Sequence, residues 1–167
     1  MRAIALATAA VAALLSSMPA SALDLPKERV VLTVTGVIDE TNDGEQAVFD
    51  LAMLNALPGR AGAMETPWTD GQTRFSGPLL RSLLAAVGAH GSALRITALN
   101  DYSAELPIAD ATEFDTMLAT KMDDKPMSVR DKGPLFLVYP FDTNPELYNE
   151  KYFSRSVWQI KSIEVIE

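Results

Sequence analysis

"FSGPLLRSLLAAVGA", Phe75 to Ala89, is the most clearly patterned stretch of the sequence. Pro78 follows Ser76 and Gly77, at a position that suits the first turn of a helix because the N–H groups there have no partner within the helix. Apolar side chains then recur at helical spacing and form one stripe: Leu79, Leu80, Leu83, Leu84 and Val87. Gly88 ends the pattern. The stretch predicts a short amphipathic helix with a leucine face turned to the core.

Most of the sequence on either side of this helix has the character of strands. Arg29–Ile38 is rich in β-branched residues and alternates, which predicts a strand, whereas Ala47–Gly59 predicts a short helix stopped by Pro58. Further extended segments are expected around the turns at 70–71 and 100–101, over 115–122 and 133–141, and at the C-terminus, with a short turn or helix near 110–114. In the C-terminal strand, alternation puts Val157, Gln159 and Lys161 on one face and Trp158, Ile160 and Ile163 on the other. The fold class is therefore α+β, mainly β, in a single domain.

The first residues have the pattern of an export signal. Arg2 precedes an apolar run, Ala3–Leu15, and "ASA" at Ala20–Ala22 fits the small-x-small rule of a signal-peptidase site. The alternative is a retained membrane anchor, but the run is shorter than the roughly 20 residues that cross a bilayer. We expect a signal peptide over residues 1–22 and a mature domain over 23–167, exported to the periplasm with no stable membrane insertion.

Composition excludes several classes of function. The chain has no cysteine, so it can have neither disulfides nor thiolate metal sites nor a cysteine nucleophile. Its formal net charge is −8, which argues against nucleic acid as a partner because phosphate backbones select basic faces.

Two possible catalytic or metal sites have weak support. His90 is the only histidine, and it follows the end of the Phe75–Ala89 helix, where an exposed structural histidine is the simpler interpretation. "DETNDGEQAVFD", residues 39–50, echoes a calcium loop, but its twelfth position is Asp50 rather than Glu and a strand precedes it. A turn between a strand and a helix explains this loop better.

Two other groups of residues are candidates for ligand binding. Trp68 lies in "TPWTDG" among turn-forming residues, where it is either a packing anchor or a flat platform for a planar ligand. In "NDYSAELP", Asn100, Asp101 and Tyr102 place an amide, a carboxylate and a phenol together at a strand junction. Because Asn–Asp favours turns by itself, turn chemistry and a binding site both remain open here.

The order of four motifs resembles the molybdopterin-binding domain of the sulfite oxidase family. They are "FSGPLLRSLLAAVGA", "LNDYSAELPIAD", "LATKMDDKPMSVRDKGPLFLVYPFD" and "WQIKSIEV", and the resemblance covers about residues 30–165. It implies the sulfite oxidase-type fold and a molybdopterin-like ligand. In the enzymes of that family a cysteine thiolate binds molybdenum, whereas the corresponding stretch here, "METPWTDG", has no cysteine. No protein-ligated molybdenum is therefore expected.

The sequence is most similar to short, exported, cysteine-less members of this fold. Some of these resemble periplasmic pterin-binding proteins that report to the outer part of a membrane enzyme controlling cyclic-di-GMP. The resemblance implies that Trp68 or Tyr102 stacks on a pterin, that Asp101 accepts from its amino edge, and that Asn100 satisfies an exocyclic oxygen.

The family resemblance also gives a role to the positive charge that precedes the apolar run Leu135–Tyr139. It implies that the loop "SVRDKGP" carries Arg130 and Lys132 to the opposite wall of the pocket, where Gly133 lets the backbone approach the ligand. The alternative is a solvated basic loop whose cations pair with neighbouring acids.

Three functions follow as expectations. The first is a non-catalytic periplasmic binder of a pterin or molybdopterin-like ligand that signals through a membrane protein partner. The second is a molybdopterin-dependent oxidoreductase, or a subunit of one, without the cysteine metal ligand. The third is a protein-interaction module that keeps the fold without any ligand.

Overall fold

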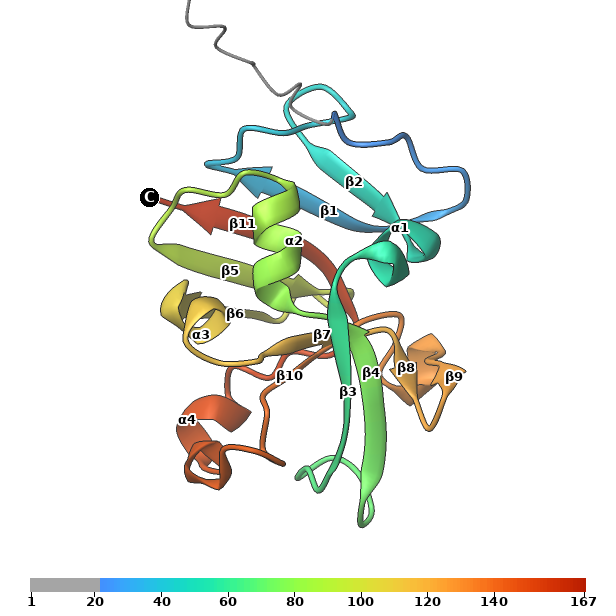
Figure 1. Cartoon of the computed structure of the whole chain (residues 1–167), viewed down its shortest axis with the longest axis vertical. Helices are drawn as coiled ribbons and strands as arrows, with labels where there is room; N and C mark the ends of the chain where they lie inside the picture. The colour runs from blue at the N-terminus through green and yellow to red at the C-terminus, as the bar shows by residue number, and fades with distance from the viewer. Residues whose placement is uncertain (1–21) are drawn as a thin grey trace, which may run out of the picture.

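The computed structural model describes residues 22–167, so the predicted signal segment lies outside the described residues except for Ala22. The central feature is a five-stranded sheet in the order β2-β1-β11-β5-β6 (Figure 1). Its strands are β1 (Val30–Gly36), β2 (Ala47–Asp50), β5 (Ala93–Ala98), β6 (Ser103–Pro107) and β11 (Ile160–Ile166). The pair β1–β11 is parallel and the other pairs are antiparallel. In this strand order β11, the last strand of the chain, lies in the middle of the sheet.

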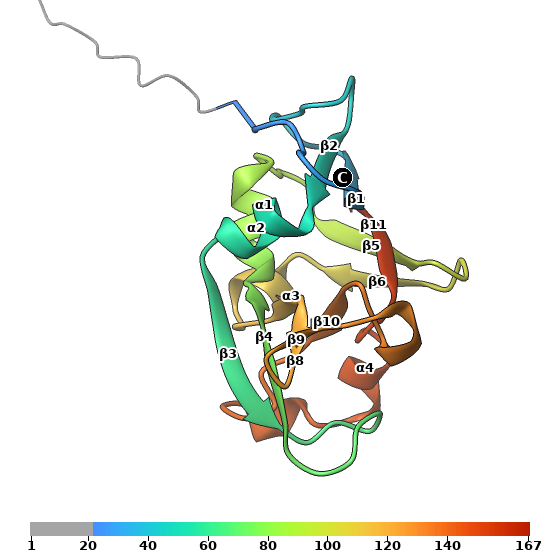
Figure 2. The same ribbon diagram turned by 90° about the vertical axis from the view of Figure 1, so that its right-hand side faces the viewer.

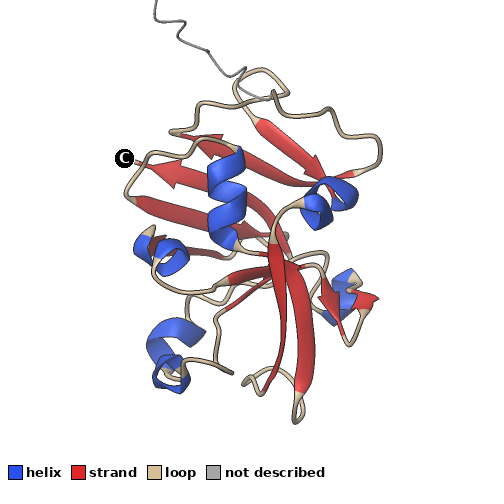
Figure 3. Cartoon of the chain, in the orientation of Figure 1, coloured by secondary structure: helices blue, strands red, loops and turns tan. Residues whose placement is uncertain are grey.

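The helices α1 (Leu51–Ala56) and α2 (Leu80–Ala86) lie against one face of this sheet (Figure 3). The predicted apolar stripe is buried except at Leu79, which is half-buried, but Pro78 ends the preceding strand and the helix begins two residues later. The helix expected from Ala47 also begins later, because Ala47–Asp50 are all buried and pair with β1 as strand β2. Asp50 ends that strand and caps α1, accepting a hydrogen bond from the backbone N–H of Met53 at 2.8 Å.

A second group of strands lies below the sheet in Figure 1. A long ribbon of β3 (Gly59–Met64) and β4 (Thr73–Pro78) continues into β8 (Lys121–Met122) and β9 (Lys125–Pro126). A separate pair, β7 (Met117–Ala119) and β10 (Phe136–Val138), packs beside β4. The extended segments predicted around the 70–71 turn and over 115–122 and 133–141 are thus confirmed, although each contains shorter strands than expected.

Short helical turns complete the chain: α3 (Ala109–Thr112), η1 (Val129–Asp131), η2 (Pro145–Leu147) and α4 (Glu150–Phe153). Within residues 22–167, no helix is long and apolar enough to cross a membrane. The prediction of an α+β, mainly β, single domain is confirmed.

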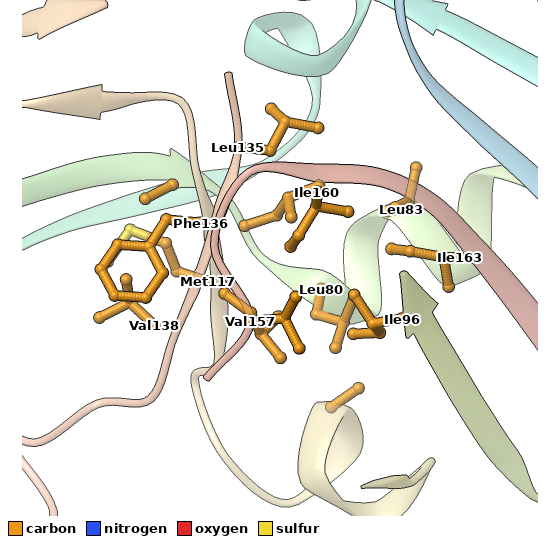
Figure 4. Close-up of a cluster of buried hydrophobic side chains, with 14 of the residues drawn as sticks. Leu80, Leu83, Ile96, Met117, Leu135, Phe136, Val138, Val157, Ile160 and Ile163 are labelled. Carbon is orange, nitrogen blue, oxygen red and sulfur yellow. The ribbon is translucent and has the colours of Figure 1, made fainter. Parts of the chain in front are cut away.

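The core joins the sheet to the second group of strands. Figure 4 shows Leu80 and Leu83 of α2 facing Ile96 and Ile163 of the sheet, with Phe136 and Val157 continuing the cluster toward β7 and β10. Burial of this many apolar side chains is the main stabilising contribution in a chain without disulfides.

The C-terminal alternation predicted from the sequence is wrong at two residues, Val157 and Trp158. Val157, Ile160 and Ile163 are all buried, whereas Trp158 is 39% exposed. Gln159 has a left-handed backbone with φ 55°, and this reverses the side-chain alternation just before β11 begins.

Candidate ligand pocket

A pocket of about 320 Å³ opens where three parts of the fold meet. The β3–β4 loop contributes Trp68, the β5–β6 hairpin contributes its turn, and the segment from the end of α4 to β11 forms the remaining wall. The complete lining is Trp68, Ala98, Asn100, Tyr102, Phe153, Ser154, Ser156, Val157, Trp158 and Gln159. Four of these residues are aromatic, which suits a flat ligand.

Trp68 is held in a fixed orientation. Its backbone N–H donates to the hydroxyl oxygen of Thr66, which also lies 2.8 Å from the hydroxyl of Thr69. The indole packs edge-to-face on Phe136 and Phe153, with ring centroids 5.7 and 5.9 Å away. The packing-anchor interpretation of Trp68 is therefore confirmed, and the same ring also forms part of a pocket wall.

The β5–β6 turn brings two predicted residues to the pocket. The side-chain oxygen of Asn100 accepts a hydrogen bond from the backbone N–H of Tyr102, as Asn does in turns, which leaves its amide N–H groups free to donate. The Tyr102 hydroxyl donates to the carbonyl oxygen of Ser154 at 3.1 Å. This bond ties the hairpin to the opposite wall and closes one side of the pocket.

Asp101, the third predicted residue of this turn, does not line the pocket. It occupies the left-handed position of the turn, with φ 66°, and its exposed carboxylate pairs with the Lys161 ammonium at 2.5 Å. The hydrogen bond and charge of Lys161 hold the pKa of Asp101 below its ordinary range. The turn geometry thus directs this carboxylate to a neighbouring strand.

The basic loop lies beside the pocket, and none of its three predicted residues lines it. Lys132 has a left-handed backbone, φ 71°, that ends η1, and its ammonium lies 5.8 Å from the centre of the Trp158 ring. Gly133 approaches its own chain closely, since a Cβ there would lie 2.0 Å from the carbonyl oxygen of Met127. Arg130 is exposed on η1. The loop therefore supports Trp158 from outside the pocket.

Gln159 and Trp158 are pocket residues that the sequence did not single out. Hydrogen bonds tie Gln159 to two other segments. Its N–H donates to the Lys132 carbonyl and its side-chain amide donates to the Val129 carbonyl at 2.6 Å, both in the η1 loop, and its carbonyl accepts from the Leu99 N–H. A left-handed residue other than glycine costs free energy and is retained where surrounding contacts enforce it, often at functional sites. The adjacent Trp and Gln in "SVWQIK" were a signal, but the assumption of an uninterrupted strand concealed it.

The polar groups of the pocket are neutral. The lining contains no Asp, Glu, Lys, Arg or His. Ser154 and Ser156 donate their hydroxyls to backbone carbonyls of α4, so their oxygens remain available as acceptors. With the amide of Asn100 and the indole N–H groups as donors, the pocket can satisfy a planar ring whose edge mixes donors and acceptors.

The residues present do not suit a protein-ligated metal. In the stretch where the family resemblance places a metal-binding thiolate, Met64 is buried and Thr66 is hydrogen-bonded to Thr69, and the sequence has no cysteine. Within residues 22–167, no group of three or more His, Cys, Asp or Glu side chains lies close enough to hold a metal ion. The pocket thus suits an organic ring better than a metal coordinated by the protein.

Comparison with known proteins places this pocket in a family context. Residues 26–167 match the family model described as the oxidoreductase molybdopterin binding domain. The fold is similar to the crystal structure of the sulfane dehydrogenase SoxCD from Paracoccus pantotrophus, with a TM-score of 0.61 and 18% sequence identity. That match covers 87% of this chain but only 40% of the SoxCD chain, and at this identity it concerns the fold alone. No curated protein sequence matches the chain.

Proposed function

We propose, from the premise that the chain belongs to the oxidoreductase molybdopterin-binding domain family, that it binds a pterin-type ligand between Trp68, Tyr102 and Trp158. The observation that carries the proposal is the pocket itself, which combines aromatic walls with neutral hydrogen-bonding groups. The family and the sulfite oxidase-type fold are as the sequence predicted.

The size and charge of the pocket favour the pterin ring over a larger phosphorylated cofactor. A volume of about 320 Å³ is at the small end of ligand pockets, which hold about 300–1,000 Å³. A phosphate group is bound by cations or by several backbone N–H groups, and the pocket lining contains no cation. Lys132 lies behind Trp158, outside the lining, with its ammonium 5.8 Å from the centre of the indole ring.

The chain's own residues bind and orient this ligand. Trp68 and Trp158 supply aromatic surface, Asn100 donates to the ring edge, and the Tyr102–Ser154 bond holds the hairpin against the opposite wall. A molybdenum–pterin group would supply two-electron redox chemistry when bound, but the side chains here provide no metal ligand. We therefore propose a binding role without catalysis.

The wider role that we propose is ligand sensing in the periplasm, reported to a membrane protein partner. Two features of the sequence support it: the export signal pattern at residues 1–22 and the absence of cysteine in an exported chain. The pocket rim is formed by exposed side chains of Tyr102 and Trp158, so a bound ligand would alter a surface that a partner can contact.

The experiment is to purify the exported full chain and identify what it carries. We expect a pterin by mass spectrometry and fluorescence, and binding of reduced pterins to the stripped protein by calorimetry. Trp68→Phe should weaken binding, whereas Leu25→Ala, a matched apolar change outside the pocket, should not. No co-purified pterin and no binding by calorimetry would sink the proposal and favour a ligand-free interaction module.

The second candidate, a molybdopterin-dependent oxidoreductase or its subunit, is favoured by the family match over residues 26–167. Elemental analysis separates the two functions. Molybdenum in stoichiometric amount would favour the enzyme, and its absence from a pterin-loaded protein would favour the binder.

A further inference from the structure

The exposed apolar side chains of this protein are concentrated on one face. Seven large apolar residues are clearly exposed within residues 22–167, and five of them lie beside each other: Val30, Leu99, Tyr102, Val129 and Trp158. The remaining two are Leu25 and Tyr148. Scattered apolar residues need no explanation, but a contiguous exposed patch marks an interaction site.

The five residues line two cavities that hydrogen bonds of Gln159 connect: Tyr102 and Trp158 line the ligand pocket, and the other three line its neighbour. Val30, Leu99 and Val129 line a second cavity of about 260 Å³, together with Arg29, Pro134 and Lys161. Gln159 joins this cavity to the ligand pocket, because its carbonyl accepts from Leu99 N–H and its side-chain amide donates to the Val129 carbonyl. We call this surface, from Val30 to Trp158, the docking face. In Figure 2 the tip of the β5–β6 hairpin and the loop after β9 lie on the same side of the molecule.

The docking face is basic on an acidic protein. Arg29, Arg130 and Lys132 border it, and none of them forms an ion pair with any carboxylate in the described part of the chain. Of the carboxylates nearby, Asp101 is neutralised by its ion pair with Lys161, whereas Glu28 and Asp131 keep their charge, and Asp131 accepts a hydrogen bond from the Ser128 hydroxyl at 2.7 Å. With a net charge of −8 for the whole chain, this local excess of free cations selects negatively charged partners.

We propose that the docking face binds an acidic protein segment that inserts an apolar side chain between Val30, Leu99 and Val129. A concave apolar cavity with a polar rim is the arrangement of an anchor site in protein interfaces. A lipid surface fits less well, because interfacial membrane binding uses the apolar face of an amphipathic helix or a lipid chain, whereas these residues line a cavity between strands and loops. The proposal rests on the proposed function only in requiring a protein partner, and it does not depend on the identity of the pocket ligand.

The primary test is site-specific photo-crosslinking in the organism that encodes the chain. A crosslinking amino acid at Val129 should give an adduct with an acidic, apolar-containing peptide of another protein. The same group at Leu25, an equally apolar exposed position that lines neither cavity, should not. Arg29→Glu should reduce the Val129 adduct at least about tenfold and added salt should weaken it, whereas Arg81→Glu on α2 should leave it unchanged.

A second measurement uses defined probes with the purified full chain. Three synthetic peptides of equal length carry an acidic flank with a leucine anchor, the same flank with serine in place of leucine, or a basic flank with leucine. Only the first should bind, and Val129→Asp should weaken it at least about tenfold because it places a carboxylate inside the cavity. That variant keeps the backbone carbonyl that holds Gln159, so its affinity for reduced pterins should not change.

Several results would overturn the proposal. One is the absence of a Val129-dependent adduct together with no binding of the acidic anchor peptide, and another is equal binding of the basic peptide. Adducts formed only with a second copy of this chain, or only with its own residues 1–21, would also overturn it. So would binding to anionic phosphatidylglycerol vesicles that Val129→Asp abolishes. Failure of pterin binding with intact acidic-peptide binding would refute only the proposed ligand. We expect Trp68→Ala to give this result, in which pterin binding is lost and acidic-peptide binding is intact.

Discussion

The hydroxyl of Tyr102 donates a hydrogen bond to the backbone carbonyl of Ser154, joining the β5–β6 hairpin to the end of α4 across the ligand pocket. The two residues are 52 positions apart in sequence, and each lies in a short exposed segment. The bond therefore determines how closely two independently positioned walls approach each other. The contribution of this bond to stability and ligand affinity can be separated from that of the Tyr102 ring.

Tyr102→Phe removes this bond and keeps the ring. We expect the unfolding free energy to fall by no more than about 1 kcal/mol, because the bond is exposed and its net contribution is small. Affinity for reduced pterins should fall several-fold, since the pocket wall is less constrained, and Tyr102→Ala should lower it further. Calorimetric titration of both variants provides the measurement, and equal affinities for wild type and Tyr102→Ala would contradict the role of Tyr102.

Substitutions of Trp68 can separate the contribution of the indole to packing from its contribution to ligand affinity. Trp68→Ala loses two edge-to-face contacts, with Phe136 and Phe153, and should destabilise the protein by about 2–4 kcal/mol. Trp68→Phe keeps an aromatic ring, so we expect a cost of about 1 kcal/mol but a clear loss of pterin affinity and of ligand-induced fluorescence quenching. Denaturant unfolding and fluorescence titration measure the two effects. Unchanged affinity in Trp68→Phe would show that the indole is only a packing residue.

Asp50 should make the stability of the protein depend on pH in the acid range. The backbone N–H groups of Met53, Lys27 and Glu28 donate to its carboxylate and hold its pKa below the ordinary 3.8 in the folded state. The unfolded state therefore binds the proton more readily, so the stabilisation is present above about pH 4 and is lost as the pH falls through the folded pKa. Asp50→Asn should be less stable than wild type at neutral pH, with the difference shrinking in acid.

Denaturant unfolding over a pH series measures this difference. Glu45→Gln is the matched control, because Glu45 forms no side-chain hydrogen bond with the described residues and its replacement should shift the whole profile little. A constant difference between wild type and Asp50→Asn at all pH values would contradict the linkage.

The sequence predicted the parts of the fold that follow from local pattern. The leucine stripe of α2, the turn at Asn100 and Asp101, and the buried run around Phe136 all have local signals, and the structure contains each of them. The errors occurred where tertiary contacts override local preference. Ala47–Asp50 has a helical pattern but pairs with β1, and its burial on both sides decides the outcome.

The pocket was predicted only in part, because some of its residues have local sequence signals and others are positioned by tertiary contacts. Trp68, Asn100 and Tyr102 lie in turn-rich loops that draw attention in a sequence, and all three line the pocket. Asp101 and Lys132 were assigned to the pocket from the family resemblance, yet backbone geometry directs Asp101 to Lys161 and places Lys132 behind Trp158. Gln159 was missed because the segment was interpreted as an uninterrupted strand, in which a left-handed backbone at this residue is not expected.

A buried polar cluster behind the pocket wall gives the last prediction. The Asp110 carboxylate accepts hydrogen bonds from the Tyr139 hydroxyl at 2.6 Å and the Arg155 guanidinium at 2.7 Å. Burial and then the bond to Asp110 raise the pKa of the Tyr139 phenol far above its ordinary value. Arg155 lies between Ser154 and Ser156 of the pocket lining, so the cluster fixes that wall.

Removing Asp110 should be more damaging than removing the Tyr139 hydroxyl. Asp110→Ala leaves a partly buried guanidinium without its carboxylate and should cost about 3–5 kcal/mol. Tyr139→Phe leaves the ion pair intact and should cost about 1–3 kcal/mol. Because the folded state keeps the phenol protonated, the stability that this residue contributes is present below the ordinary tyrosine pKa of about 10 and is lost above it as the unfolded chain ionises. Ultraviolet titration of tyrosinate should show one tyrosine that ionises only on unfolding, and Tyr139→Phe should remove that step. A step that survives in Tyr139→Phe, or equal destabilisation by the two variants, would contradict this account of the cluster.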